Sequence, residues 1–385
     1  MNWGLPYKGS KNKIAEWVVS HLPKAAHFYD LFAGGCAITH CAALSGKYEH
    51  LHANDLNGGM VELFKGAMAG DYANETRWIS REDFYRLKES DPYVASCWSF
   101  GNNLKNYMYS EEIEPWKKAL HYARVFGDCS LLEAFGIQSD GSREDIVRNH
   151  EEYKQKYIRW WLAQQKYSAE ELDELITAER LNVAKEEEEL REYLLNALRE
   201  SGLTQREVGR RLGTQMEGHY FGRSQWEFPT EEHYRKMQTF MLALDQEYNE
   251  IVGLYRLSQS LESLQSLESL QRLQSLESLQ SLQRLQTSST DYREVRFEED
   301  AVIYCDPPYK GTDSYLSEFD HEEFYNWLRS IGRPVYVSEY SMPADFVPIA
   351  RRVKTVSLQG GSGKKAVESI WLHQRWVKVV EQTLF

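Results

Sequence analysis

Residues 27–35 read His-Phe-Tyr-Asp-Leu-Phe-Ala-Gly-Gly, and this stretch decides the fold. Its apolar run predicts a buried strand, the glycine pair ends that strand, and a helical stretch follows to Leu44. A second strand at 50–53 ends in Asn54-Asp55 and precedes a helix from about Gly59 to Ala69. Strand, turn, helix and strand in this order predict a βαβ unit and therefore a parallel sheet.

Strand patterns return near the C-terminus, whereas residues 111–250 are mostly helical in character. The returning segments are 301–305, 334–338, 352–356 and 369–376. The simplest interpretation is one α/β domain built from both ends of the chain and interrupted by a helical insertion. We therefore expect four segments: the N-terminal half of the core (1–105), a helical insertion (106–253), a spacer (254–289) and the C-terminal half of the core (290–385).

The spacer contains a low-complexity tract of leucine triplets at residues 258–286. Leucine recurs at every third position from Leu261 to Leu285. On a helix of 3.6 residues per turn, this period rotates the leucine stripe by about -60° per repeat, so the leucines define no single apolar face. The pattern favours a helical spacer, while a flexible linker and a partner-binding zipper remain alternatives.

Composition limits the class of protein. A length of 385 residues suggests two or three domains, and 42% hydrophobic residues exclude global disorder. No apolar run approaches the ~18 residues of a membrane span, and the basic N-terminus lacks the apolar core of a secretory signal. The five cysteines are an odd number and form no C-x-x-C pair. We therefore expect a soluble cytoplasmic protein with neither a disulfide scaffold nor a metal site.

The net charge of -13 argues against a polyanionic partner, but the charge is unevenly distributed. Residues 168–192 are rich in acids, whereas residues 199–223 contain five arginines and three glutamates. An acidic protein can still bind DNA through a local basic face, so net charge does not exclude DNA.

The strongest chemical motif is Asp306-Pro307-Pro308-Tyr309, which directly follows an apolar strand. Active residues of α/β sheets lie at this end of a strand. A carboxylate and a carbonyl held by two prolines can accept both hydrogens of an exocyclic amine, and the tyrosine ring offers a surface for a flat base. A proline-rich turn without chemistry is the alternative interpretation.

Two further motifs suggest a cofactor site. Asp30, followed by Gly34-Gly35, lets a nucleoside approach the backbone closely, although the glycine spacing differs from a dinucleotide fingerprint. Asp55 stands where an acid binds ribose hydroxyls, but a helix N-cap is the alternative. The N-terminal segment with Tyr7 and Lys11 is, by itself, a turn leading into a helix.

Taken together and in this order, the motifs resemble those of the DNA N6-adenine methyltransferases of the Dam-like, α-type arrangement. The resemblance covers about residues 1–105 and 290–385. It implies a class I S-adenosylmethionine-dependent methyltransferase fold, with a mixed seven-stranded sheet whose antiparallel last strand is 369–376. It also implies S-adenosylmethionine as cofactor, bound by Tyr7, Lys11, Asp30, Phe32, Gly34, Gly35, Asp55 and Asp306. The catalytic residues would be Asp306, Pro307, Pro308 and Tyr309.

Within the insertion, residues 203–213 resemble the first helix and turn of a phage-repressor helix-turn-helix. Thr204 and Glu207 have the spacing of a capping box, and Gly213 lies at the turn. Residues 214–226 would form the reading helix. The DNA-contact candidates of the whole segment are Arg206, Arg210, Arg211, His219, Tyr220, Arg223, Ser224 and Gln225. An ordinary helical hairpin with a solvated arginine face is the alternative.

The resemblance implies methyl transfer to N6 of adenine in double-stranded DNA, with the target base flipped out and stacked on Tyr309. A covalent enzyme intermediate is not expected, and Cys305 is expected to be a core residue. Two alternatives remain: an N4-cytosine DNA methyltransferase and a non-catalytic DNA-binding protein on the same fold. The motifs do not determine the recognition sequence, the oligomeric state or the existence of a partner restriction nuclease.

Overall fold

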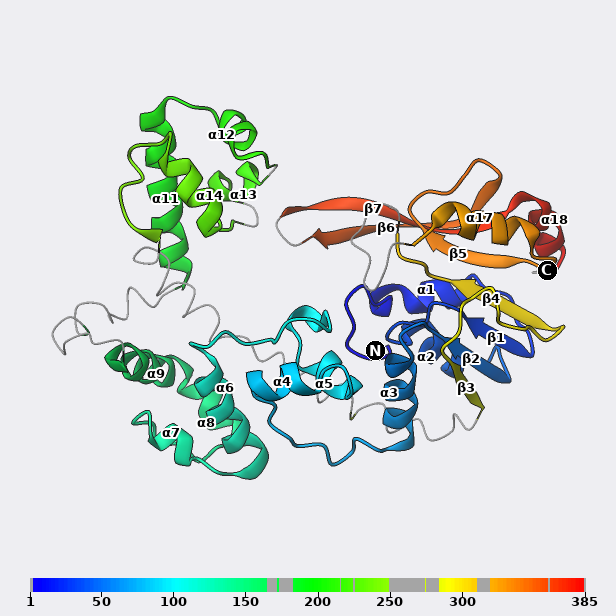
Figure 1. Cartoon of the computed structure of the whole chain (residues 1–385), viewed down its shortest axis with the longest axis horizontal. Helices are drawn as coiled ribbons and strands as arrows, with labels where there is room; N and C mark the ends of the chain where they lie inside the picture. The colour runs from blue at the N-terminus through cyan, green and yellow to red at the C-terminus, as the bar shows by residue number, and fades with distance from the viewer. Residues whose placement is uncertain are drawn as a thin grey trace. The chain divides into compact units, whose positions relative to one another are not determined.

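The computed structural model describes residues 3–164, 172, 183–214, 216–223, 226–248, 274, 284–309, 319–358 and 361–383. The chain divides into two compact units. Figure 1 labels the helices and strands of both. The sheet unit comprises Met1–Met108, Gln265–Lys354 and Lys365–Phe385. The helical unit comprises Tyr109–Leu264 and Thr355–Lys364.

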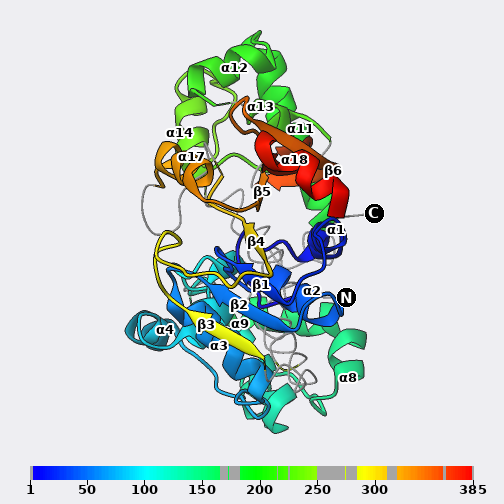
Figure 2. The same cartoon turned by 90° about the vertical axis from the view of Figure 1, so that its right-hand side faces the viewer.

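The sheet unit is built on a seven-stranded sheet of order β3-β2-β1-β4-β5-β7-β6. From β3 through β2, β1 and β4 to β5, each strand is parallel to the next, whereas β7 runs antiparallel to β5. Figure 2 shows the first five following one another in this order. The strands are β1 (His27–Asp30), β2 (His50–Asn54), β3 (Leu285–Ser288), β4 (Ala301–Cys305), β5 (Val335–Glu339), β6 (Phe346–Leu358) and β7 (Gly361–His373). This confirms the mixed sheet expected from the sequence, although the strand expected at 369–376 ends at His373.

Both faces of the sheet are buried, because successive side chains of each strand point to opposite sides. On one face, Phe28 of β1 packs in a core with Val18 and Ile38 of helices α1 (Ala15–Ser20) and α2 (Ala37–Leu44). On the other face, Tyr29 lies in a core with Phe324 of α17 (His321–Ser330). Each large apolar side chain buried in this way stabilises the fold by about 1.5–3 kcal/mol. The sheet is therefore fixed between two helical layers.

Side-chain caps determine where several helices begin. Asp320 accepts a hydrogen bond from the Glu323 amide at the start of α17, at 2.9 Å. Asp91 likewise accepts from the Tyr93 amide at 3.0 Å, with proline at the first helical position. The other helices of the sheet unit are a 3-10 helix (Asn12–Ile14), α3 (Gly58–Ala69), α4 (Arg81–Leu87), α5 (Pro92–Cys97), a 3-10 turn (Phe100–Asn102) and α18 (Gln374–Thr383).

The helical unit contains two described groups of helices. The first group is α6 (Glu114–His121), a π-helical turn (Tyr122–Phe126), α7 (Ser130–Glu133), α8 (Arg143–Arg148) and α9 (His150–Gln164). The second is α11 (Val183–Ser201), α12 (Gln205–Leu212), α13 (Glu217–Phe221) and α14 (Glu231–Gln238). A core that includes Leu194, Val208, Tyr220 and Met237 holds the second group together. No described helix is long and apolar enough to cross a membrane.

The expected spacer at 254–289 is wrong at its C-terminal end, because residues 285–288 form strand β3. Leu285 and Gln286 pair with Leu51 and His52 of β2. The Ser288 hydroxyl also donates to Asn54 Oδ1 at 2.8 Å. Pairing with an existing strand therefore determines the conformation of the last triplet. Of the earlier triplets the structure describes Gln274 alone, so the helical spacer prediction lies outside the described residues.

Candidate active site

Three acidic residues predicted to be functional come to the same edge of the sheet. Asp30 ends β1, Asp55 follows the end of β2, and Asp306 follows the end of β4. The register places Asp30 beside Ala53 of β2 and Tyr304 of β4. Because these strands are parallel, their carboxyl ends meet, and the sequence motifs that follow them converge there.

Asp30 is buried and has an unusual electrostatic environment. Its Oδ2 accepts a hydrogen bond from Thr39 Oγ1 at 2.7 Å, while its Oδ1 has no hydrogen-bond partner in the described structure. Burial raises the pKa of the Asp30 carboxyl to about 7; the Thr39 hydrogen bond opposes the shift, and the negative charges of Asp306 and Asp55 add to it. The site therefore has an unsatisfied buried acceptor and an excess of negative charge.

Asp55 ties the glycine turn to the start of α3. Its two oxygens accept hydrogen bonds from the Gly34 amide at 2.7 Å and the Asn57 amide at 2.8 Å. Asn57, not Asp55, is the N-cap residue of α3, so the N-cap interpretation of Asp55 is wrong. Burial raises the pKa of Asp55 despite these two hydrogen bonds.

The glycine pair accommodates the N-terminal segment of the chain itself. Gly34 has a φ of +48°, and a Cβ atom there would lie 3.0 Å from the Tyr7 ring. A Cβ atom on Gly35 would lie 2.7 Å from Tyr7 Cβ. Any larger residue would displace Tyr7, so these glycines bring two predicted cofactor-binding segments into contact.

Phe32 lies apart from the glycine pair in an aromatic cluster. Its ring centroid is 5.4 Å from that of Tyr292 and 5.7 Å from that of Phe324 on α17. The ring is half-buried, so part of its surface is still exposed.

Lys11 places a positive charge in the site. Its ammonium Nζ lies 2.8 Å from Asp306 Oδ1 and 3.8 Å from Glu368 Oε1 of β7. Burial lowers the pKa of Lys11, but the Asp306 and Glu368 carboxylates more than offset this and raise the pKa above its ordinary value. Lys11 is therefore a fixed cation shared by two carboxylates.

Tyr309 is held by contacts on its ring and on its hydroxyl. The hydroxyl donates a hydrogen bond to Glu368 Oε1, and Lys11 Nζ lies 4.3 Å from the ring centroid. The Tyr340 ring packs against it edge to face at 4.6 Å. Burial and the nearby carboxylates raise the pKa of Tyr309 well above its ordinary value, so the hydroxyl stays protonated and remains a donor.

The two prolines of the motif are fixed by their surroundings. Pro307 is buried, and the Pro308 carbonyl oxygen accepts a hydrogen bond from His321 Nε2 at 2.9 Å. His321 is the first residue of α17, so this helix supports the motif that follows β4.

Sequence reasoning missed Glu368, which contacts both Lys11 and Tyr309. The residue has no exposed surface and belongs to the pattern Ala-Val-Glu-Ser-Ile-Trp-Leu-His of residues 366–373. The signal was an acidic side chain beside the apolar residues Val367 and Ile370 of a strand, since an acid is rarely buried without a partner.

The structure contains the first helix and turn of the segment that resembles a helix-turn-helix, whereas its second helix is shorter than expected. Thr204 and Glu207 form the capping box, and Gly213 ends α12 with a φ of +77°. The expected reading helix at 214–226 is only the short α13, and His219 and Tyr220 on it are buried. Tyr220 lies in the core, and its hydroxyl is 2.6 Å from His233 Nδ1. Both side chains therefore serve packing in the described structure, and their contact with DNA stays a prediction.

The predicted arginines of this segment lie at the surface. Arg206, Arg210, Arg211 and Arg223 are exposed. The Arg211 guanidinium lies 5.1 Å from the Phe240 ring centroid, so part of its side chain serves packing. The remaining candidates, Ser224 and Gln225, lie outside the described residues.

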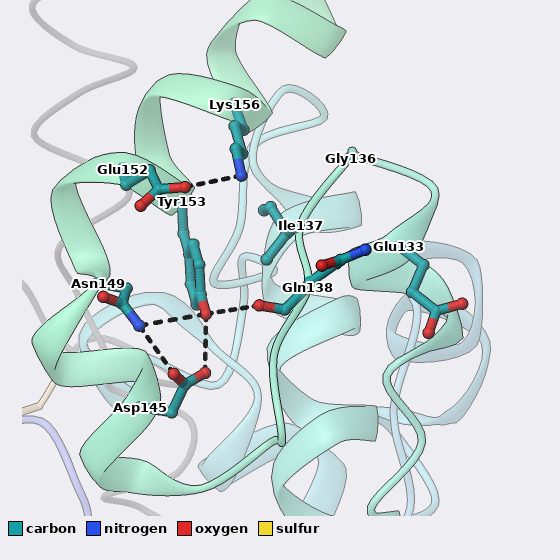
Figure 3. A pocket seen from close by; sticks show the side chains of 9 residues that line it. All are labelled: Glu133, Gly136, Ile137, Gln138, Asp145, Asn149, Glu152, Tyr153 and Lys156. Atoms are coloured by element: carbon teal, nitrogen blue, oxygen red, sulfur yellow. Dashed lines mark hydrogen bonds and ion pairs between the residues drawn. The ribbon is translucent and has the colours of Figure 1, made fainter.

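The helical unit also contains a cavity of about 650 Å³ (Figure 3). Its lining residues are Glu133, Gly136, Ile137, Gln138, Asp145, Asn149, Glu152, Tyr153 and Lys156. Its polar groups largely satisfy one another: Lys156 pairs with Glu152 at 2.7 Å, and Asp145 accepts from Tyr153 at 2.8 Å. None of the predicted functional residues lines it. The described residues also contain no group of three side chains suited to hold a metal ion.

Comparison with known proteins identifies one family. A family model described as D12 class N6 adenine-specific DNA methyltransferase matches residues 7–230, more than half of the chain. The matched region includes the glycine turn, Asp55 and the α12–α13 segment, and it ends before Asp306. A comparison with curated proteins gives no significant match.

Proposed function

Since the chain belongs to the D12 class of N6 adenine-specific DNA methyltransferases, we propose that it takes its methyl group from S-adenosylmethionine at the edge of the sheet described above. The observation that carries this proposal is the cluster of Lys11, Asp306, Tyr309 and Glu368 beside the buried Asp30. The reaction is methyl transfer to N6 of adenine in DNA. We infer from the DNA substrate that the enzyme acts in the cytoplasm of a bacterial cell or of a phage-infected host.

The residues present fit such a cofactor. S-adenosylmethionine is a sulfonium cation that supplies an electrophilic methyl group when bound. Asp30 offers a buried oxygen without a hydrogen-bond partner, and Asp55 and Asp306 add negative charge at the same edge. Asp55 is suited to accept the ribose hydroxyls, because each of its oxygens retains a lone pair beyond its backbone hydrogen bond. Tyr7 and Phe32 would contribute apolar surface.

The catalytic motif is suited to orient the target amine. The Asp306 carboxylate and the Pro307 carbonyl would accept the two N6 hydrogens, so that the nitrogen lone pair faces the methyl group. Tyr309 would offer its ring to the flipped adenine, since the base is inaccessible inside the duplex. Most of the rate acceleration then comes from orientation and electrostatics.

The Asp306–Tyr309 motif and the strand before it offer no suitable nucleophile for a covalent enzyme intermediate. Cys305 is fully buried in β4, and burial, with Asp30 and Asp306 nearby, raises the pKa of its thiol well above the ordinary value. The thiol therefore stays protonated and unreactive. Direct transfer to the amine is the pathway that these residues support.

Exposed arginines of α12 supply the sequence-independent part of DNA binding in this proposal. Arg206 and Arg210 are exposed on a single helix, which suits contacts to phosphates.

The test is methylation of genomic DNA by the purified protein with labelled S-adenosylmethionine, followed by mass spectrometry of the nucleosides. We expect N6-methyladenine from the wild type and less than about a tenth of its turnover from Asp306→Ala, a loss of at least ~1.4 kcal/mol of transition-state stabilisation. N4-methylcytosine would instead indicate a cytosine enzyme. Label transfer by Asp306→Ala at the wild-type rate would contradict the assigned site.

A further inference from the structure

Glu368 is a buried acid to which the catalytic scheme above gives no role. It lies on β7, one residue before Ser369, which pairs with Glu339 of β5. No part of Glu368 is exposed. An ionised carboxylate in such a place is strongly destabilising unless it is paired, so its presence on this strand needs a reason.

Glu368 Oε1 contacts two groups of the active site. It accepts the hydrogen bond of the Tyr309 hydroxyl, and it lies 3.8 Å from the Lys11 ammonium. Lys11 in turn lies 2.8 Å from Asp306 Oδ1. One ammonium group is therefore shared between Asp306 and Glu368, with Asp306 the nearer partner.

This sharing weakens Asp306 for the role assigned to it, because a carboxylate paired with an ammonium group is a poorer acceptor for the hydrogens of an amine. The carboxylate that must accept the amine hydrogens of the target adenine is already paired with Lys11 in the structure. Separating a buried ammonium group from its carboxylate partner costs free energy, because the ammonium group then loses the negative charge that compensates for its burial. Lys11 therefore needs a second anionic partner when the base arrives.

We propose that Glu368 is this second partner: a positioning residue that holds Lys11 and Tyr309 while Asp306 turns to the adenine amine. The inference rests on the proposed function, since it assumes that Asp306 accepts the amine. In the free enzyme Lys11 bridges both carboxylates. In the complex with DNA it moves toward Glu368, whose Oε1 also keeps the Tyr309 ring in place for the base.

The central experiment is a double-mutant cycle in the full-length enzyme. Glu368→Gln keeps an oxygen acceptor for the Tyr309 hydroxyl but removes the negative charge. We expect kcat to fall about tenfold or more, while KM for DNA stays within about threefold of the wild type. In a Lys11→Met background the same change should cost no more than about twofold, because the cation that needs a partner is absent.

Two control variants make the result decisive. Ser369→Ala alters the same strand on its opposite face and should leave kcat unchanged. Glu368→Asp keeps the charge and should retain clearly more activity than Glu368→Gln. If Glu368→Gln does not fold, Glu368→Asp alone decides: at least a third of the wild-type kcat supports the proposal, and a loss as large as that of Asp306→Ala overturns it.

The inference and the proposed function fail in different ways. A wild-type rate for Glu368→Gln with an inactive Asp306→Ala overturns the role of Glu368 and leaves the site assignment intact. Equal costs of Glu368→Gln with and without Lys11 also overturn it. Retention of activity by Asp306→Ala, by contrast, removes the premise of both.

Discussion

The carboxyl edge of the sheet and the surface of α12 use charge in opposite ways. At the sheet edge, the buried Lys11 lies 2.8 Å from Asp306 and 3.8 Å from the buried Glu368, so their charges act on one another over a few ångströms. On α12, Arg206 and Arg210 are exposed to solvent. Buried charges set orientation and pKa values, whereas exposed charges attract a polyanion and are screened by salt. Substitutions at the sheet edge should therefore affect turnover, and substitutions on α12 should affect DNA binding.

The largest expected effect is on turnover. Tyr309→Ala removes both the ring for the flipped base and the hydrogen bond to Glu368. We expect duplex methylation to fall by ~100-fold, about 2.7 kcal/mol, with cofactor affinity changed far less. Tyr336→Phe, a buried tyrosine elsewhere in the sheet, is the matched control and should stay close to wild type. Equal losses of turnover and cofactor affinity for Tyr309→Ala would place the tyrosine at the cofactor instead.

The second largest expected effect is on the affinity for DNA. Replacing Arg206 and Arg210 by alanine should weaken DNA binding and reduce the slope of log K against log salt by up to about 0.9 per lost phosphate contact. Arg211 is left in place because it also packs on Phe240. Tyr220→Phe, buried beneath this surface, should leave the slope unchanged. An unchanged slope in the arginine double variant means that DNA contacts other parts of the chain.

A smaller effect concerns the stability of the cofactor-free enzyme. The folded-state pKa of Asp30, about 7, lies above its unfolded value of about 3.8. The folded state therefore binds this proton more tightly, and the associated stability is complete below pH 3.8 and lost as the pH rises toward 7. Asp30→Asn should abolish this loss, so that its melting temperature relative to wild type increases from pH 5 to pH 8. The expected change in the free energy of unfolding over this pH range is on the order of 2–4 kcal/mol.

The same Asp30→Asn variant should bind S-adenosylmethionine more weakly, because it loses a negative charge at the proposed cofactor site. Thermal melts across the pH range, with and without cofactor, measure both effects. A melting difference that does not vary with pH would contradict the raised pKa.

The smallest expected effect is that of shortening the leucine tract. Deleting residues 275–286 joins Arg272-Leu273-Gln274 to Thr287-Ser288 and so regenerates the Arg-Leu-Gln-Thr-Ser sequence of the β3 segment. We therefore expect a folded enzyme with nearly unchanged activity. Leu285→Asp in the full-length chain should be far more harmful, because Leu285 pairs with Leu51 and packs on the core. Circular dichroism and methylation assays compare the two; an insoluble deletion variant would show that the tract itself is needed for folding.

Local signals in the sequence determined the catalytic half of this protein well. The apolar runs at 27–32 and 301–305 are long enough to form strands, and the motifs after them are fixed to the same sheet edge by parallel pairing. The Thr204–Glu207 capping box was equally predictable, because both partners lie within one helical turn. The sequence alone thus determined the central strands of the sheet, the acids at their ends and the start of α12.

Only the tertiary structure decided the rest, since it depends on partners far apart in the chain. Glu368 meets Tyr309 and Lys11 because β7 inserts beside β5, which no local pattern encodes. Leu285 and Gln286 belong to a strand because they pair with Leu51 and His52 of β2. His219 and Tyr220 are buried because the short α13 turns its aromatic residues into the core of α11, α12 and α14. Periodicity assigns a residue to an element, but long-range packing decides what that residue faces.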